Sequence, residues 1–446
     1  MRIPIPRRLF LAAGAALLAA LTAAAPPPAA AQDRVVIREG TFRPVPIAAP
    51  TFIPAAGSEN DPGVAEIAAT ITQVIRDDLA RSGLFSIIPT GRIESLEVSP
   101  AFAEWRGRGA DNLLAGEVGF EPDGRLGVRF RLWGLSPSEQ LDQLKFLADP
   151  AGARRVAHKV ADRVYTLLTG EGAYFDTRIV FVEERGPKNN RRKRLAIMDS
   201  DGANLAYLTS DQHLVLTPRF SPAEQSITFI SYQGGQPEVY LLNLTTERQE
   251  RLGQFPGMTF APRFSPLGDR VAMSLSRAGE SDIFLMDLAT RRTAQLTDVP
   301  GIDTSPSFAP DGSKIVFESD RSGAQQLYVM EPDGSDQSRI SFGDGRYANP
   351  VWSPRGDLIA FTKQAAGKFH IGVMRPDGEG ERLLTTSFLD EGPSWAPNGR
   401  VLMFTRETPG ADGAPQLHVV DVELGVVTKL NTQYGASDAA WSPLLR

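Results

Sequence analysis

The segment Pro350-Val351-Trp352-Ser353-Pro354 decides the fold, because its pattern of an aromatic residue followed by Ser or Ala and then Pro recurs through the second half of the chain. The related segments are Pro218–Pro222, Pro262–Pro266, Pro306–Pro310, Pro393–Pro397 and Ala440–Pro443. In chain order, the final prolines are 44, 44, 44, 43 and 46 residues apart. We call these segments the anchors. Their spacing is that of one four-stranded blade, so they predict a β-propeller.

Each anchor is followed by turn residues and then by a run of β-branched and aromatic residues. Asp311-Gly312 is one such turn, and Ile315-Val316-Phe317 is the run that follows it. Asp-Gly and Asn-Gly pairs supply the positive φ that tight hairpin turns need. Four strands joined by hairpins form one antiparallel sheet, which buries its faces by stacking on neighbouring sheets around an axis. The pattern therefore predicts an all-β propeller.

The two ends of the repeat array complement each other. The unit 178–209 has candidate outer strands but no anchor before them, whereas Trp441-Ser442-Pro443 is followed by only three residues. We expect the C-terminal strand to become the inner strand of the first blade, which closes a ring of six blades. A seven-bladed ring would need another blade upstream, and residues 33–170 do not show one.

Residues 32–170 predict a separate α/β domain, so the expected fold is an α+β N-terminal domain followed by an all-β six-bladed propeller at 171–446. We expect a helix that begins at Asp61-Pro62 and ends at Gly83, and a second helix that ends at Gly170. The expected strands are Val35–Ile37, Val45–Phe52, Phe85–Ile88, Leu113–Val118 and Leu126–Leu135, and the second helix is Ala153–Leu168. The simplest packing places both helices on one face of the sheet.

Residues 1–31 have the order of a secretory signal. Arg2, Arg7 and Arg8 precede an apolar run from Leu9 to Leu21, and an Ala-x-Ala site ends at Ala31. The alternative is a membrane anchor, but the apolar run is shorter than the roughly 20 residues of a spanning helix. We expect export with cleavage after Ala31, by either the general or the twin-arginine route, and no integral membrane segment in a product that is expected to be monomeric.

Composition excludes several kinds of chemistry. The 446 residues include no cysteine, which rules out disulfides, thiolate metal sites and a cysteine nucleophile, and the four histidines are scattered. The formal charge of −6 argues against a nucleic-acid partner. The basic run 188–194 is interpreted as a solvated hairpin tip, with a nucleic-acid patch as the weaker alternative.

No catalytic motif is complete. The closest match to a Gly-x-Ser-x-Gly elbow is Gly435–Ala439, which ends in Ala, and no phosphate-binding loop is present. We therefore predict no catalytic residue, no cofactor and no metal site. An exported propeller-type hydrolase or sugar-processing enzyme stays open as the alternative. Asp303, Asp390 and Asp438 are candidates for lining the channel mouth, where hydration is favoured over a bound cation.

The signal, the small α/β domain and the six anchors together resemble the TolB family of the Tol–Pal cell-envelope system over essentially the whole mature chain. Two segments carry the resemblance most specifically: Arg34–Gly40, and Ser387–Glu391 with Pro393-Ser394. The resemblance implies a periplasmic adaptor without enzymatic activity that supports outer-membrane integrity and constriction during cell division. It also implies that TolA binds the mature N-terminal segment, which consists of Arg34, Val35, Val36, Ile37, Arg38, Glu39, Gly40 and Thr41.

The second partner implied by the resemblance is the lipoprotein Pal, which would bind one face of the propeller. We expect the loops that enter the inner strands to form this face, because all inner strands begin on one side of the ring. Exposed aromatic residues, Met and Arg suit an interface, although any one of them is as well explained as an ordinary loop residue. The candidates are His213, Leu214, Met258, Thr259, Phe260, Asp303, Thr304, Arg346, Tyr347, Asn349, Leu389, Asp390 and Glu391. In contrast, we expect Phe264, Trp352 and Trp395 to lie in the core between blades.

Overall fold

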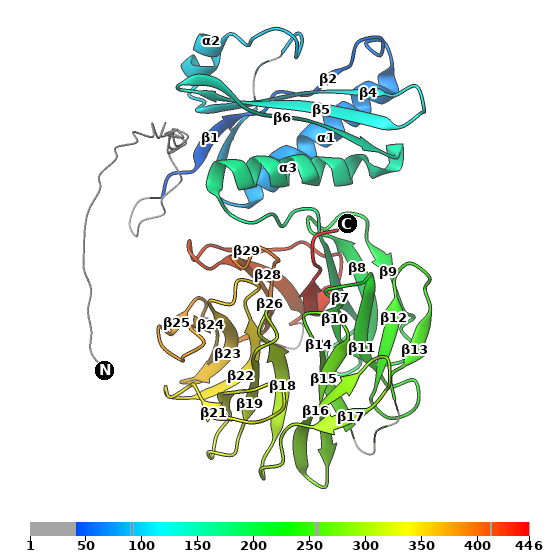
Figure 1. The fold of residues 1–446 in the computed structure, drawn as a ribbon, viewed down its shortest axis with the longest axis vertical. Helices are drawn as coiled ribbons and strands as arrows, with labels where there is room; N and C mark the ends of the chain where they lie inside the picture. Colours follow the sequence, from blue (N-terminus) through cyan, green and yellow to red (C-terminus); the bar gives the residue numbers. More distant parts are fainter. Residues whose placement is uncertain are drawn as a thin grey trace, which may run out of the picture.

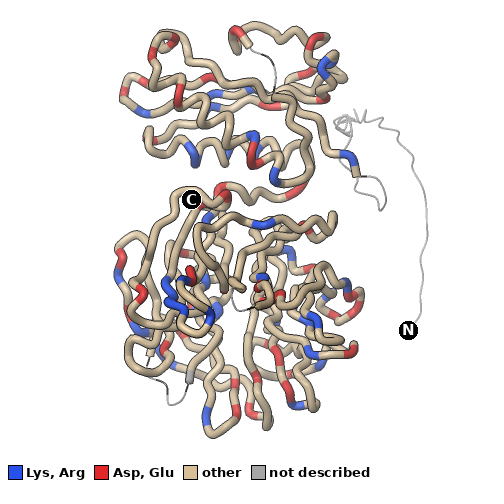
Figure 2. Tube along the Cα trace, turned by 180° about the vertical axis from the view of Figure 1, so that it is seen from behind, with Lys and Arg blue, Asp and Glu red and all other residues tan. Residues whose placement is uncertain are grey.

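The computed structural model describes residues 42–445 except 90, 92, 254, 256, 257, 411 and 412. The predicted signal sequence, the strand at Val35–Ile37 and the segment Arg34–Thr41 lie outside the described residues. The described chain forms two halves, with the propeller below the N-terminal half and the end of the chain between them (Figure 1). Acidic and basic residues are interspersed along both halves (Figure 2).

A mixed sheet with the strand order β3-β1-β4-β5-β6 forms the N-terminal half, and β2 pairs with β4. Helices α1 and α3 lie side by side between this sheet and the propeller, whereas α2 covers the opposite face (Figure 1). The strands are β1 (Val45–Ala48), β2 (Ile53–Pro54), β3 (Phe85–Ile88), β4 (Asn112–Phe120), β5 (Leu126–Leu135) and β6 (Ser138–Ala148), and the helices are α1 (Pro62–Arg81), α2 (Phe102–Gly107) and α3 (Ala153–Thr169).

The two predicted helices are confirmed, together with the residues that end them. The Asp61 carboxylate accepts hydrogen bonds from the backbone N–H groups of Gly63 and Val64 at the start of α1. Gly83 and Gly170, which follow α1 and α3, have φ of 71° and 75°, a left-handed conformation that favours glycine.

Three details of the N-terminal half differ from the sequence-based expectation. The single strand expected at Val45–Phe52 is wrong, because β1 ends at Ala48 and the Phe52 N–H leaves the ladder to donate to Thr72 Oγ1. The edge strand β6 and the short helix α2 were not expected. Strand β6 alternates poorly because most of its residues are exposed, and α2 has no side-chain cap at its N-terminus.

The propeller consists of six four-stranded antiparallel sheets. From inner to outer strand, the first five are β10 (Val215–Phe220), β11 (Ser226–Ser231), β12 (Glu238–Asn243) and β13 (Gln249–Arg251); β14 (Met258–Phe264), β15 (Arg270–Arg277), β16 (Glu280–Asp287) and β17 (Thr293–Gln295); β18 (Asp303–Phe308), β19 (Ile315–Ser319), β20 (Gln326–Met330) and β21 (Ser338–Arg339); β22 (Arg346–Trp352), β23 (Ile359–Ala365), β24 (Lys368–Met374) and β25 (Arg382–Leu383); and β26 (Leu389–Trp395), β27 (Val401–Glu407), β28 (Pro415–Asp421) and β29 (Val427–Lys429).

The sixth sheet closes the ring and confirms the prediction made from the chain ends. Its order is β30-β7-β8-β9, with bounds Gly435–Trp441, Arg178–Arg185, Arg192–Asp199 and Ala206–Tyr207. Trp441 lies opposite Ile179 in the β30–β7 ladder. Its indole N–H donates to Thr177 Oγ1 at 2.7 Å. The last strand of the chain, β30, is therefore the inner strand of the blade whose other strands, β7, β8 and β9, come first in the propeller sequence.

All six inner strands carry a bulge at the same place. The bulged residues have φ between 47° and 63°, and only one of them is a glycine: Thr217, Ala261, Ser305, Asn349, Gly392 and Asp438. The ladder shifts its register at these positions. In some blades the N–H of the bulged residue bonds the preceding blade, as from Asn349 to Glu318 Oε2 at 2.6 Å. These bonds help to hold a strained backbone conformation, which costs about 1–3 kcal/mol at a non-glycine residue.

The two halves share one hydrophobic core. A single cluster of buried residues includes Leu79 of α1, Tyr165 of α3, and Met198 and Trp441 of the propeller. The linker is held by the Asp162 carboxylate, which accepts three backbone N–H bonds from residues 174–176 at 2.7–2.9 Å. At its other end, Glu171 pairs with the buried Arg400 at 2.9 Å. The halves therefore pack as one body.

A buried histidine lies at this contact between the halves. His158 of α3 bonds Asp78 of α1 through Nδ1 at 2.6 Å, and its Nε2 lies 3.8 Å from Asp201 of the propeller. The two carboxylates also pair with Arg81 and Arg154 respectively. Asp78, His158 and Asp201 have the donor types of a metal site, but the two guanidinium groups already neutralise the carboxylates, so the cluster is organised as an ion-pair network.

This network predicts a pH-dependent contact. Burial opposes protonation of His158, but Asp78 and Asp201 outweigh burial and raise its pKa above the ordinary 6.5. The raised pKa stabilises the fold fully below pH 6.5, and this contribution is lost as pH rises through the folded-state pKa. Burial also raises the pKa of Asp162, to about 6. This carboxyl is therefore mostly ionised by pH 6.5, and it contributes little to changes in the free energy of unfolding above that pH.

We therefore expect the free energy of unfolding to decrease as pH rises above 6.5, as measured by denaturant unfolding over a pH series. His158→Gln is expected to lose this decrease. His213→Gln, which changes an exposed histidine of the propeller, is expected to keep it. An unchanged decrease in His158→Gln contradicts the assignment.

Candidate functional site

The propeller has two different mouths. Each inner strand begins at one mouth, which we call the loop face, and ends at the other, which we call the anchor face because the anchors lie there. The N-terminal half contacts the anchor face, where Arg81 bonds the Ser200 carbonyl at 2.6 Å and Glu171 bonds Arg400. The loops expected to bind Pal therefore lie on the face that points away from the N-terminal half.

The predicted loop residues separate into three groups according to burial. Exposed residues are His213, Leu214, Arg346 and Glu391; half-buried residues are Phe260, Thr304, Asn349 and Leu389; buried residues are Thr259, Asp303, Tyr347 and Asp390. Met258 begins β14, and its side chain lies outside the description. The expectation that Tyr347 is an exposed contact is wrong, because its side chain is fully buried.

Buried acids of the loop face are paired within their own blades. Asp303 pairs with Arg321 at 2.6 Å, and Asp390 accepts two bonds from Arg406 at 2.7 Å. Burial opposes ionisation of Asp390, but Arg406 outweighs it and lowers the pKa of this carboxyl. These acids therefore hold the starts of the inner strands, and they do not converge with Asp438 on a cation site.

Tyr347 likewise holds the start of an inner strand, β22. Its hydroxyl donates to Glu381 Oε2 at 2.7 Å and accepts from Lys363 Nζ at 2.7 Å. Lys363 also pairs with Glu381 at 2.6 Å. The three side chains form a closed polar network beneath the loop that precedes β22.

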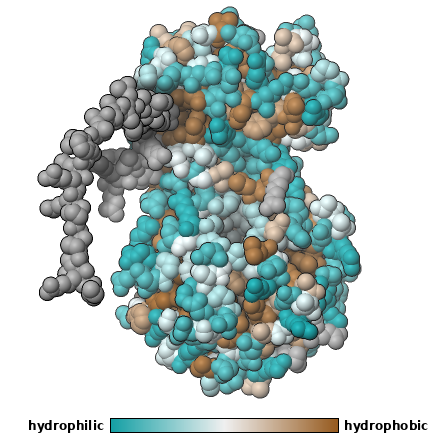
Figure 3. All heavy atoms as spheres, viewed as in Figure 1, coloured by the Kyte–Doolittle hydropathy of each residue, from teal (hydrophilic) through white to brown (hydrophobic). Residues whose placement is uncertain are grey.

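The exposed apolar side chains of the loop face include Leu214, which was predicted from the sequence, and five that were not. They all lie in the connections that precede the inner strands, and they are Leu214, Val299, Ile302, Phe342, Phe388 and Tyr434. Phe342 and Phe388 are 74% and 52% exposed. A large apolar residue within a turn-rich connection was the available signal. Elsewhere hydrophilic residues cover much of the surface in the view of Figure 3, with apolar residues in separate groups.

The basic hairpin between β7 and β8 is neutralised by acidic residues of β7 and of β27 in the neighbouring blade. Lys188 pairs with Glu407 at 2.8 Å, and Arg191 and Lys193 pair with Glu184 at 3.0 and 2.8 Å. This arrangement agrees with a hairpin tip. Ser437, the serine of the incomplete elbow motif, is buried in β30 and donates to Glu184 Oε1, so it lacks the geometry of an activated nucleophile.

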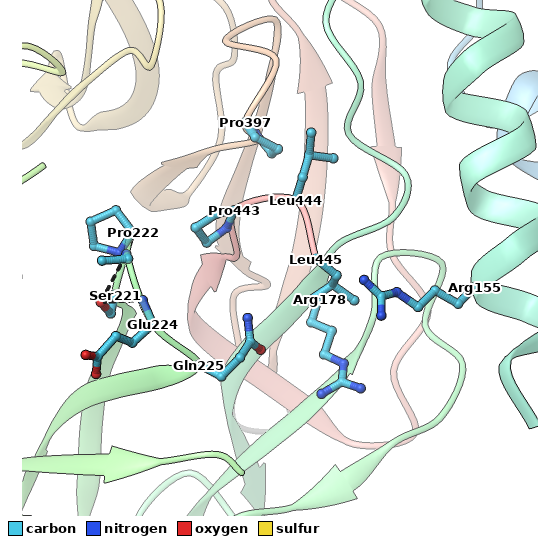
Figure 4. A pocket seen from close by; sticks show the side chains of 11 residues that line it. Arg155, Arg178, Ser221, Pro222, Glu224, Gln225, Pro397, Pro443, Leu444 and Leu445 are labelled. Atoms are coloured by element: carbon cyan, nitrogen blue, oxygen red, sulfur yellow. Dashed lines mark hydrogen bonds between the residues drawn. The ribbon is translucent and has the colours of Figure 1, made fainter. Parts of the chain in front are cut away.

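A cavity of about 450 Å³ lies on the anchor side, where the last residues pass close to α3 (Figure 4). Arg155 and Arg178 line it together with Leu444 and Leu445. Arg155 pairs with Asp176 at 3.1 Å, so its charge is balanced. This cavity lies at the junction between the two halves.

The fold and the loop face define the class of protein: a six-bladed propeller closed by its C-terminal strand, with an α/β half packed on one mouth and apolar side chains exposed at the other. Residues 165–445 match the family model of the TolB beta propeller domain, and residues 33–141 match that of the TolB amino-terminal domain. The chain belongs to the TolB family.

Known relatives support this assignment. The Tol-Pal system protein TolB of Paramagnetospirillum magneticum is 50% identical over 231 residues, which are 51% of this chain and 51% of that protein. The chain thus matches about half the length of this curated relative. The crystal structure of TolB from Acinetobacter baumannii superposes with a TM-score of 0.79 at 26% identity, covering 90% of this chain and 97% of that chain.

A more distant structure shows the fold alone. Hydrazine synthase of Kuenenia stuttgartiensis matches with a TM-score of 0.50 at 12% identity, covering 61% of this chain and 47% of that chain. No helix in the described part of the chain is long and apolar enough to cross a membrane.

Proposed function

We propose that this chain is a periplasmic, non-enzymatic adaptor of the Tol–Pal system, which binds the lipoprotein Pal through the loop face and TolA through Arg34–Thr41. In this proposal, residues 1–31 are the export signal, 32–170 form the TolA-side domain and 171–446 form the Pal-binding propeller. The adaptor works as a monomer without metal or cofactor and supports outer-membrane integrity and constriction during division.

The exposed apolar side chains of the loop face are the observation that carries the Pal half of the proposal. Phe342 and Phe388 lie on neighbouring blades, in the connections before β22 and β26. Aromatic side chains at the centre of an interface, surrounded by polar groups, are the usual source of binding energy between proteins. The ion pairs of Asp303 and Asp390 beneath the loops keep this surface preorganised, which lowers the ordering cost of binding.

The TolA half rests on the position and composition of the N-terminal segment. Arg34–Thr41 contains Val35-Val36-Ile37 and immediately precedes Phe42, which packs against the shared core. A terminal β-prone segment is suited to pairing with the exposed sheet edge of a partner. Binding of one partner changes the affinity for the other only if this segment has a docked and a released state, and the two states differ in their affinity for the partners.

Phe388→Ala is expected to weaken Pal binding by roughly 30-fold, because loss of a hot-spot aromatic costs about 2 kcal/mol. Isothermal titration of the mature chain with the soluble domain of Pal measures the change. Phe342→Ala is expected to act in the same direction.

Leu267→Ala is the matched control, because Leu267 is 78% exposed but lies in the turn after β14 on the anchor face. We expect it to leave Pal binding unchanged. Equal losses in Phe388→Ala and Leu267→Ala, or a loss in Leu267→Ala alone, contradict the choice of the loop face.

A further inference from the structure

Six equivalent side chains form a ring inside the anchor face. Each lies three residues before the final proline of its anchor, and all six line one cavity of about 350 Å³: Arg219, Arg263, Ser307, Val351, Ser394 and Ala440. The next residue in every anchor is aromatic and also lines the cavity. Among the described residues that line it are two arginines and no Asp or Glu. The ring is therefore positively charged on one side.

The two arginines lie on neighbouring inner strands and differ in their partners. Arg219 donates to the Pro218 carbonyl at 2.6 Å and is close enough to Asp438 to be stabilised by its charge. Arg263 forms no ion pair and no side-chain hydrogen bond with any residue that the structure describes, and its charged neighbour is Arg219. Burial lowers the pKa of Arg263, and the neighbouring charge of Arg219 lowers it further. Arg263 is thus a cation whose charge the described protein does not balance.

Hydroxyl donors complete the lining. Ser307 Oγ accepts from the Trp352 backbone N–H at 3.1 Å, and Ser394 Oγ accepts from the Trp441 backbone N–H at 3.2 Å. Because each oxygen is used as an acceptor, each hydroxyl proton remains to be donated. The indole N–H of Trp395 is already bonded to the Val351 carbonyl at 3.0 Å. The donors available in the cavity are therefore guanidinium and hydroxyl groups.

We propose that this cavity binds a small oxyanion, a phosphate or a carboxylate, between Arg219 and Arg263. A guanidinium group matches both anions with two parallel N–H bonds, and an anion would balance the charge of the half-buried Arg263. The site lies on the anchor face, opposite the proposed Pal surface, and so goes beyond the adaptor function.

The test uses the mature chain in a buffer without phosphate or carboxylate, to which sodium phosphate, sodium acetate or sodium chloride is added at equal ionic strength. Thermal unfolding and tryptophan fluorescence are both recorded, because Trp352, Trp395 and Trp441 line the cavity. We expect saturable changes in both signals with phosphate or acetate and none with chloride. A response to phosphate alone assigns the site to phosphoryl groups, and a response to acetate assigns it to carboxylates.

Three variants make this test decisive. Arg263→Gln removes an unbalanced, half-buried cation, so it is expected to fold, to unfold at a higher temperature than the wild type without anion, and to bind roughly tenfold more weakly or worse. Arg263→Lys keeps the charge without the planar fork and is expected to bind with intermediate affinity. Arg248→Gln removes the same charge from a side chain that is 78% exposed, and is expected to respond like the wild type.

Several results overturn the proposal. These are equal responses of the wild type and Arg263→Gln, a chloride response as large as that to phosphate and acetate, and no response to either oxyanion. Unchanged affinity in Arg263→Lys also overturns it, because the proposed contact depends on the guanidinium fork.

Discussion

A chain that ends at Tyr434 is expected to lack a folded propeller. The missing strand β30 is the inner strand of the first blade, and all its ladder partners lie in β7, more than 250 residues earlier in the chain. Without it, β7 exposes an unpaired edge at the centre of the ring, and the blades on either side lose their neighbour. The chain has no cysteine, so no disulfide replaces this closure. Circular dichroism and cooperative thermal unfolding measure the loss.

Trp441→Ala tests the same closure with a single side chain. The indole packs in the core shared by both halves, lies edge-on to Tyr174 at 6.0 Å between ring centres, and donates to Thr177. Its removal is expected to cost about 3–5 kcal/mol of the free energy of unfolding.

A chain that ends at Pro443 is the control, because it keeps β30 and removes only the three residues after it. We expect this control to retain cooperative unfolding. A folded, cooperative protein after removal of β30 would show that the ring does not depend on its closure.

Deletion of Arg34–Thr41 is expected to abolish TolA binding and to leave Pal binding unchanged. The deletion ends before Phe42, the first described residue, so the contacts of the described fold are retained. The proposed Pal surface lies at the far mouth of the propeller. Backbone pairing of an extended segment with a partner sheet is lost completely when the segment is absent.

A Gly/Ser segment of the same length in place of Arg34–Thr41 is the control for chain length. It is expected to be as defective as the deletion, because the β-prone side chains are missing. Titrations with both partners measure the two affinities on one preparation. Equal loss of TolA and Pal binding would contradict the proposed division between the two regions.

The propeller was predictable because its signal is repeated. Each anchor alone is a weak motif, but six anchors at nearly constant spacing leave little choice of architecture, and the unpaired ends at Arg178 and Trp441 indicate how the ring closes. The helices of the N-terminal half were predictable from periodicity and caps. Strand β6 was not, because an exposed edge strand need not alternate between apolar and polar residues.

The candidate site was predictable only at the level of loops. Which side chains are exposed depends on pairing with the adjacent strand: Asp390 lies opposite Arg406, and this ion pair buries a carboxylate that is expected, in isolation, to face water. The two arginines of the ring, Arg219 and Arg263, were visible in the sequence as Pro-Arg-Phe in two anchors. Its position in the cavity depends on the bulge before each anchor, which shifts the alternation of the inner strand.

The most direct test of the adaptor is a pull-down of Pal and TolA from the same organism with the mature wild-type chain, followed by titration of each purified partner. Our account predicts saturable binding of both partners and no turnover of peptide or glycan substrates. Binding of neither partner, together with turnover of a peptide or glycan, would contradict it.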